Sequence, residues 1–115
     1  MALPGNITTI AVTGTYVDFA GNAASGTIAF TPTATELLDP GSSTMLDAIP
    51  IVATLDTNGH FSVELPCTDN TTLFPASWTY TVTETIHGIR TYQISLPHTL
   101  GSTVDISAVA PETGV

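Results

Sequence analysis

The stretch WTYTVTETIHGIRTYQISL, residues 78–96, decides the fold class of this chain. In its first half, aromatic and valine side chains alternate with four threonines, and in its second half Tyr92, Ile94 and Leu96 alternate with polar residues. Strict alternation is typical of strands that bury one face and expose the other. We therefore expect two strands, at 78–85 and 89–96, that contribute to one core.

The turn between these strands sets their register. A two-residue loop at His87-Gly88 would put the apolar residues of the two strands on opposite faces. A three-residue loop, Ile86-His87-Gly88, puts them on one face and places a glycine where positive φ is needed. This register predicts the pairs Trp78–Leu96, Tyr80–Ile94, Val82–Tyr92 and Glu84–Arg90.

Gly and Pro punctuate the rest of the chain, and alternating apolar segments lie between them. We expect five more strands, at Thr8–Val17, Gly26–Thr31, Ile51–Asp56, His60–Leu65 and Thr103–Ile106. The fold class is then all-β, a single antiparallel β-sandwich of about seven strands. Its expected core contains Phe30, Leu55, Phe61, Val63, Trp78, Tyr80, Val82, Tyr92 and Ile94.

A second hairpin is expected where Leu55 faces Phe61 across a three-residue loop, Thr57-Asn58-Gly59. The link Pro32–Pro50 is expected to be irregular. Within it, Glu36–Asp39 forms one helical turn at most, because Pro40-Gly41 follows at once.

The length of 115 residues fits one domain. We expect an N-terminal arm at 1–7, the sandwich at 8–107 and a C-terminal arm at 108–115, with a polar loop at 66–77 crossing the molecule. The first five residues lack the basic segment and long apolar stretch of a secretory signal, so synthesis in a cytoplasm without an export address is expected.

The charge balance excludes two classes of partner. The formal net charge is −9, the chain has no lysine, and Arg90 is its only fixed cation. Nucleic acids and anionic membranes are bound through lysine and arginine, so neither is an expected partner. Charged residues make up only 10% of the chain, and threonine makes up about a fifth. We therefore expect contact with other proteins through neutral surfaces, by a strand edge, a terminal arm or both.

No residue pattern in the sequence indicates catalysis, a cofactor or a metal. No two of the histidines His60, His87 and His98 have the spacing of a metal-ligand motif, and no serine has the glycine-flanked turn of a nucleophile. The turn at Asp56–Gly59 resembles the start of a calcium loop, but Cys67 stands where the glutamate is needed. We expect no enzyme activity. A calcium site built with Asp69 or Asn70 stays open as a minor alternative.

Two further residues have competing interpretations. Trp78 and Tyr80 would form a carbohydrate platform if they faced outward, but their alternation with threonines favours the core. Cys67 is the only cysteine, so no intrachain disulfide forms. We expect an unreactive, partly buried thiol, because no neighbouring cation would lower its pKa.

Three stretches resemble the carboxypeptidase regulatory-like and Cna B-type domains. They are VTGTYVDFAGNAASGTIAF at 12–30, TLDTNGHFSV at 54–63 and WTYTV at 78–82. The resemblance implies an immunoglobulin-like or transthyretin-like sandwich used as a spacer, stalk or adhesion module. Members that cross-link themselves join a lysine to an asparagine, and the absence of lysine excludes that chemistry.

A narrower resemblance spans nearly the whole chain, through motifs such as FTP at 30–32, GHFSV at 59–63 and YQISLP at 92–97. In their order along the chain, these motifs are similar to those of small virion proteins of tailed phages that infect actinobacteria. The resemblance implies a non-enzymatic accessory protein of the virion, foremost a capsid decoration protein on the particle exterior. Its expected partners are the major capsid protein, tail subunits or further copies of itself. The alternatives are a minor tail protein and a module that binds glycans on the host surface.

Overall fold

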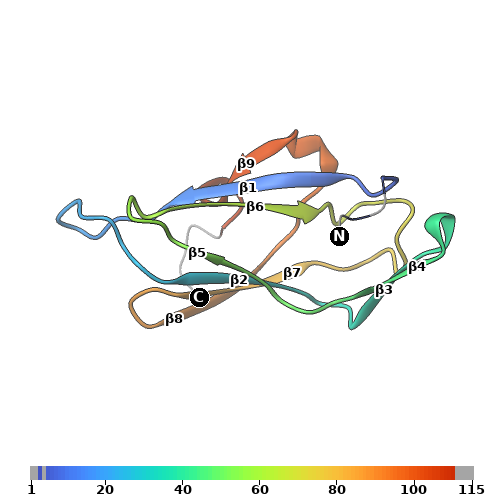
Figure 1. Cartoon of the computed structure of the whole chain (residues 1–115), viewed down its shortest axis with the longest axis horizontal. Helices are drawn as coiled ribbons and strands as arrows, with labels where there is room; N and C mark the ends of the chain where they lie inside the picture. The colour runs from blue at the N-terminus through green and yellow to red at the C-terminus, as the bar shows by residue number, and fades with distance from the viewer. Residues whose placement is uncertain (1–2, 4, 111–115) are drawn as a thin grey trace.

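The computed structural model describes Leu3 and residues 5–110, which form two packed β-sheets (Figure 1). The three-stranded sheet has the order β6-β1-β9, with strands His60–Pro66, Thr9–Thr15 and Thr103–Asp105. The four-stranded sheet has the order β5-β2-β7-β8, with strands Ile51–Thr54, Thr27–Pro32, Tyr80–Thr85 and Ile89–Ile94. The seven predicted strands are the strands of these two sheets, which confirms the all-β sandwich.

The hairpin that decides the fold has the predicted register. Tyr80 pairs with Ile94, Val82 with Tyr92 and Glu84 with Arg90. Gly88 has a φ of 86°, as the three-residue loop requires. One predicted pair is wrong: Trp78 and Leu96 lie beyond the ends of β7 and β8 and are not part of the ladder.

The link Pro32–Pro50 is not irregular, because it contains a two-stranded ribbon. Strand β3, Glu36–Asp39, pairs with β4, Thr44–Asp47, across the short 3-10 helix η1, Pro40–Ser42. Glu36–Asp39, for which the sequence allows one helical turn at most, is therefore a strand. Pairing on both sides holds β3 extended, with β4 along one edge and with Phe74 at Leu38 on the other.

Two contacts distant in sequence hold this ribbon in place. Leu38 and Phe74 exchange backbone hydrogen bonds of 2.7 and 3.0 Å. The carboxylate of Asp39 is fully buried and accepts hydrogen bonds from the Asn6 amide at 2.8 Å and the Ser42 hydroxyl at 2.6 Å. The ribbon extends from one end of the molecule (Figure 1).

The predicted hairpin at Leu55–Phe61 is correct at its turn only. Gly59 has a φ of 74°, and the Asp56 N–H donates to the His60 carbonyl oxygen at 3.0 Å. The flanking strands then separate, because β5 pairs with β2 and β6 pairs with β1. The chain thus crosses from one sheet to the other, and Leu55 and Phe61 are both buried between the sheets.

The sandwich is not purely antiparallel, because β9 runs parallel to β1. The single-turn helix α1, Ile106–Val109, follows β9 and buries Ile106 in the core. A second 3-10 helix, η2, spans His98–Leu100. Among the described residues, no helix is long and apolar enough to cross a membrane.

Several residues of the two expected arms contact the sandwich. Ile7 is buried in the core, Leu3 lines a surface groove, and α1 continues to Val109. The other parts of the expected arms, residues 1, 2, 4 and 111–115, lie outside the described residues.

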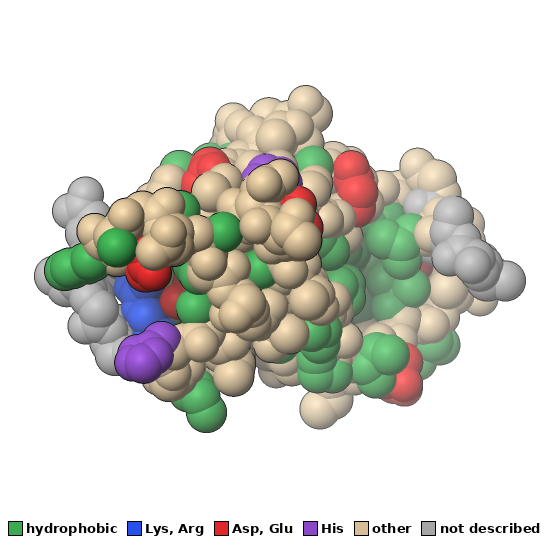
Figure 2. Space-filling view, turned by 60° about the vertical axis from the view of Figure 1, so that its left-hand side comes forward, with side chains coloured by type: hydrophobic (Ala, Val, Ile, Leu, Met, Phe, Trp, Pro, Cys, Tyr) green, Lys and Arg blue, Asp and Glu red, His purple; other side chains and the backbone are tan. Residues whose placement is uncertain are grey.

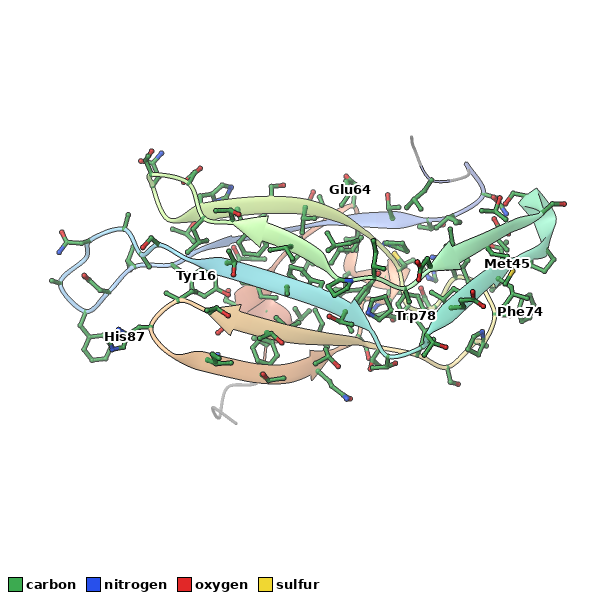
Figure 3. The ribbon with its side chains drawn as sticks, turned by 60° about the horizontal axis from the view of Figure 1, so that its bottom comes forward. Tyr16, Met45, Glu64, Phe74, Trp78 and His87 are labelled. Carbon is green, nitrogen blue, oxygen red and sulfur yellow. The ribbon has the colours of Figure 1, made fainter. Side chains whose placement is uncertain are left out.

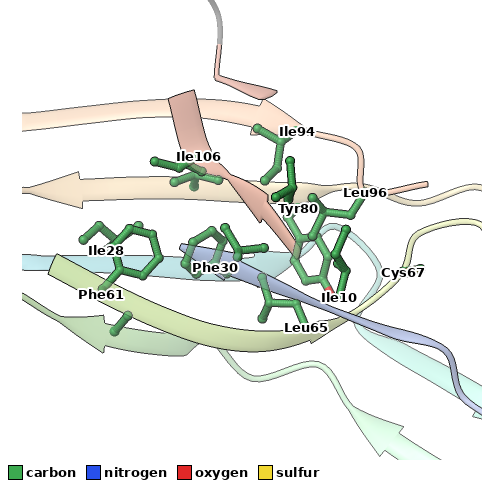
Figure 4. Packing of buried hydrophobic residues seen from close by; sticks show 14 of the residues in the cluster. Ile10, Ile28, Phe30, Phe61, Leu65, Cys67, Tyr80, Ile94, Leu96 and Ile106 are labelled. Atoms are coloured by element: carbon green, nitrogen blue, oxygen red, sulfur yellow. The ribbon is translucent and has the colours of Figure 1, made fainter. Parts of the chain in front are cut away.

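The core lies between the two sheets and is nearly the predicted one (Figure 4). Eight of the nine predicted residues are buried, and Val63 is only half-buried. Ile10, Ile28, Leu65 and Leu96 are also fully buried, each with no exposed area. No disulfide contributes, since the lone Cys67 is a free thiol, so apolar burial supplies most of the stability.

We predict different costs for alanine at the two turn glycines. A Cβ at Gly88 would meet no atom within 4 Å, so Gly88→Ala should lose only the roughly 1–2 kcal/mol of a side chain in the left-handed region. A Cβ at Gly59 would in addition overlap the backbone oxygen of Tyr16. Gly59→Ala should therefore lower the free energy of unfolding at least about twice as much. Urea denaturation measures both, and equal losses would contradict the packing at Gly59.

A second prediction concerns Trp78, which is 6% exposed and packs edge-on against Tyr80 with ring centroids 5.0 Å apart. Trp78→Ala should cost about 3–5 kcal/mol of unfolding free energy, as large-to-small core changes do. The indole Nε1 is buried and has no hydrogen-bond partner among the described residues. Trp78→Phe removes that unpaired donor, so it should cost less than half as much. Denaturation followed by circular dichroism tests the order of the two variants.

Candidate binding surfaces

Among the residues that the structure describes, none on the outer face of the four-stranded sheet is charged. We call this outer face the threonine face. Figure 3 is turned so that the side of the molecule with this face comes toward the viewer. Strand pairing places its residues in rows across the sheet. Its members are Thr27, Ala29, Thr31, Val52, Thr54, Thr81, Thr83, Thr85, Ile89, Thr91 and Gln93, all half-buried or exposed.

Both charged residues of the strands in this sheet are on its inner side. Glu84 is buried, and the Arg90 guanidinium lies 3.7 Å from its carboxylate and 4.7 Å from the centre of the Tyr92 ring. The other sheet differs, because Glu64 and Asp105 lie on its exposed face. The two outer faces of the sandwich are therefore distinct in charge, although both carry threonines.

An apolar groove of about 620 Å³ lies beside β4. Its buried walls include Leu37, Trp78 and Tyr80, and its mouth carries Met45 and Ile49, which are 57% and 64% exposed. The hollow bordered by green side chains in the right-hand half of Figure 2 shows this region. A volume of this size is in the range of sites that accept a side chain or a small ligand.

The groove has an acidic border and lies where two edge strands meet. Asp47 and Glu64 are its only charged lining residues among the described part of the chain. Ile51 of β5 and Pro66 of β6 also line it, and each of these strands is at the edge of its sheet. The groove can thus bury apolar atoms and offers no cation to an anionic ligand.

The buried polar groups near the opposite end are structural. The Glu84 carboxylate accepts hydrogen bonds from the Tyr16 hydroxyl at 2.7 Å and the Tyr92 hydroxyl at 2.6 Å. Burial, followed by the hydrogen bond to Glu84, raises the pKa of both tyrosines well above the ordinary value. Both hydroxyls therefore stay protonated and serve as permanent donors to a buried carboxylate.

The structure does not bring the three histidines together with a nucleophile or a metal-binding cluster. His87 is exposed in its turn, and the His60 ring contacts the Thr15 hydroxyl at 3.2 Å. The ring of His98 lies 2.6 Å from the carboxylate of Asp69. Partial burial raises the pKa of Asp69, but hydrogen bonds from His98 outweigh it and hold the pKa below the ordinary value.

The alternative calcium ligands are engaged elsewhere. Asp56 accepts the backbone N–H groups of Asn58 and His60, at 2.8 and 3.0 Å. Asn70 uses its side-chain amide to bind the backbone of Thr8 and Cys67. Within the described residues, no group of three or more histidines, cysteines or carboxylates is placed to hold a metal ion.

The two remaining candidates are inside the core. Cys67 has no exposed area, and burial followed by the negative charge of Asp69 raises the pKa of its thiol. It is therefore more deeply buried than the sequence suggested. Trp78 and Tyr80 face inward, as the alternation favoured, so they do not form an exposed carbohydrate platform.

Sequence reasoning missed the groove, because the ribbon that forms its side was not predicted. The sequence indicated part of the threonine face, since Thr81, Thr83 and Thr85 alternate with core residues of one strand. Its extension over four strands required the register of the sheet. Comparisons with protein-family models, with curated proteins and with solved structures find no match to this chain.

Proposed function

We propose that this chain is a non-enzymatic accessory protein of a virion that attaches to other virion proteins through its threonine face. The observation that carries the proposal is the uncharged outer face of the four-stranded sheet, on a domain of net charge −9. The centres of protein interfaces are depleted of charged residues. The rigid sandwich behind this face keeps its shape on binding, which lowers the entropic cost of attachment.

The location on the particle rests on the resemblance of the sequence to small phage virion proteins. We favour decoration of the capsid exterior, and the alternative is a minor tail protein. In either case the partner is a protein surface that is flat enough to meet a sheet. Electron microscopy of purified particles separates the two locations, because capsid density and tail density are distinct.

A matched pair of variants tests the attachment surface. Thr83 is central in the threonine face, between Ala29 and Thr91, whereas Thr13 is on the central strand of the other sheet. Both side chains are half-buried. Thr83→Arg should reduce binding to particles stripped of this protein by at least about tenfold, because it places an unpaired charge in the contact. Thr13→Arg should bind like the wild type.

Salt dependence provides an independent check. Retention on particles should be nearly unchanged between about 0.1 M and about 1 M salt, because screening acts on exposed charges and the described residues of this face carry none. Release by salt alone would show that acidic side chains meet a basic partner. Equal binding by the two arginine variants would exclude the threonine face as the attachment surface.

A further inference from the structure

The loop between β1 and β2 presents a fully exposed aromatic side chain. Phe19 has a relative exposure of 113%, and its neighbour Val17 is 58% exposed. The loop projects from the end of the long axis opposite the β3–β4 ribbon (Figure 1). Phe19 is the most exposed of the large hydrophobic residues in the described part of the chain, so its whole ring is available to a partner.

Hydrogen bonds hold this loop in one conformation. The carboxylate of Asp18 accepts the backbone N–H groups of Ala20 and Asn22, each at 2.9 Å. The Asp18 N–H donates to the Asn22 carbonyl oxygen at 2.9 Å, and Val17 forms a β-bridge with Ala23. The loop therefore presents Phe19 without a large loss of backbone entropy on binding.

The half of the molecule that carries the β3–β4 ribbon offers a receptor for an aromatic ring. The apolar groove has Trp78, Tyr80 and Leu37 as its buried walls, and its mouth is lined by exposed Met45 and Ile49. Met45 and Trp78 lie toward one end of the molecule in Figure 3, and Tyr16 and His87 lie toward the other. Aromatic rings favour edge-on and offset contacts with one another, and methionine sulfur adapts to them.

We propose that Phe19 of one copy of this chain inserts into the apolar groove of a second copy, so that copies associate head to tail. This contact does not use the threonine face, so it is independent of attachment through that face. The Phe19 loop lies at one end of a molecule about 49 Å long, and the groove lies in the half that carries the β3–β4 ribbon. Such a heterologous contact leaves a free loop and a free groove on every dimer, so association continues beyond two copies.

The size and charge of the contact predict its behaviour. One phenylalanine and its flanks bury a few hundred Å² at most, far less than a standard interface of about 1,600 Å², so the association is weak. Asp18 lies beside Phe19, and Asp47 and Glu64 border the groove. Carboxylates then face each other, and raising salt from about 10 mM to about 150 mM should strengthen the association by screening them.

Sedimentation velocity of the purified protein between about 10 µM and about 1 mM tests the proposal, since weak contacts lie in this range. The wild type should sediment faster as concentration rises, without reaching a limit at the dimer. Phe19→Ser and Ile49→Asp should each weaken association at least about tenfold. The matched controls Leu100→Ser and Leu100→Asp, at a residue that is 37% exposed and belongs to neither the loop, the groove nor the threonine face, should associate like the wild type.

A mixture of the two inactive variants gives the decisive measurement. Phe19→Ser keeps an intact groove and Ile49→Asp keeps an intact loop, so their mixture can form one junction and no more. It should produce a 1:1 heterodimer that saturates, whereas each variant alone stays monomeric. Circular dichroism confirms that both exposed substitutions leave the fold intact.

Three results would overturn the proposal. The first is a wild type that stays monomeric at about 1 mM, where weak contacts are populated. The second is self-association of the Phe19→Ser variant equal to that of the wild type. The third is a mixture of the two variants that stays monomeric. Association that weakens as salt rises would also contradict it, because it would show an ionic contact. Docking of a different protein in the groove would appear as binding that Ile49→Asp abolishes and Phe19→Ser leaves unchanged.

Discussion

The alternation of side chains along β7 couples the core of this protein to its surface. Tyr80, Val82 and Glu84 face inward, and Thr81 and Thr83 face outward. Because β7 pairs with β2 on one side and β8 on the other, its phase is imposed on both neighbours. A slip by one residue would expose Tyr80 and bury a row of threonine hydroxyls. The core and the uncharged outer face are therefore consequences of the same register.

The same alternation places the only charged residue of β7, Glu84, at a buried position. Its carboxylate is buried at the end of the core. Burial of a carboxylate is unfavourable unless hydrogen-bond or charged partners accompany it. Tyr92 and Arg90 come from the neighbouring strand, and Tyr16 comes from the segment that follows β1 in the other sheet. The carboxylate thus joins the two layers near the end that carries the β1–β2 loop. A hydrophobic residue at this position would pack but would leave two tyrosine hydroxyls unpaired.

Local sequence was sufficient for what depends on alternation and turns. The seven sheet strands, the positive φ of Gly59 and Gly88 and the Glu84–Arg90 pair follow from patterns within about 20 residues. The parallel pairing of β9 with β1 joins residues about 90 apart, and no local pattern encodes it. The turn at Gly59 likewise specifies a reversal of the chain, and only the packing decides that its two strands join different sheets.

The ribbon and the groove could not be predicted from the sequence, and both for the same reason. Leu37 and Leu38 are adjacent apolar residues, which indicate neither a strand period nor a helix. Their roles differ only in the folded protein, where Leu37 is 3% exposed and Leu38 is 40% exposed and bridged to Phe74. Trp78 was expected in the core, and it is there. That it also forms a wall of the groove depends on where the ribbon lies, which is set by long-range contacts of Asp39 and Leu38.

The choice of threonine for the exposed face has a physical consequence for any partner. A face of valine and isoleucine would bury more apolar area on contact, but so large an apolar patch would invite aggregation of the free protein. The two sheets of the sandwich also have four edge strands, and the chain has no lysine to protect them from pairing with another copy. Threonine presents a methyl group and a hydroxyl, so the face stays hydrated when free and loses little on contact compared with a charged face. Each hydroxyl still needs a hydrogen bond when water is removed. A partner of this face must therefore supply polar groups or retain bridging water, and a purely apolar surface would bind it poorly.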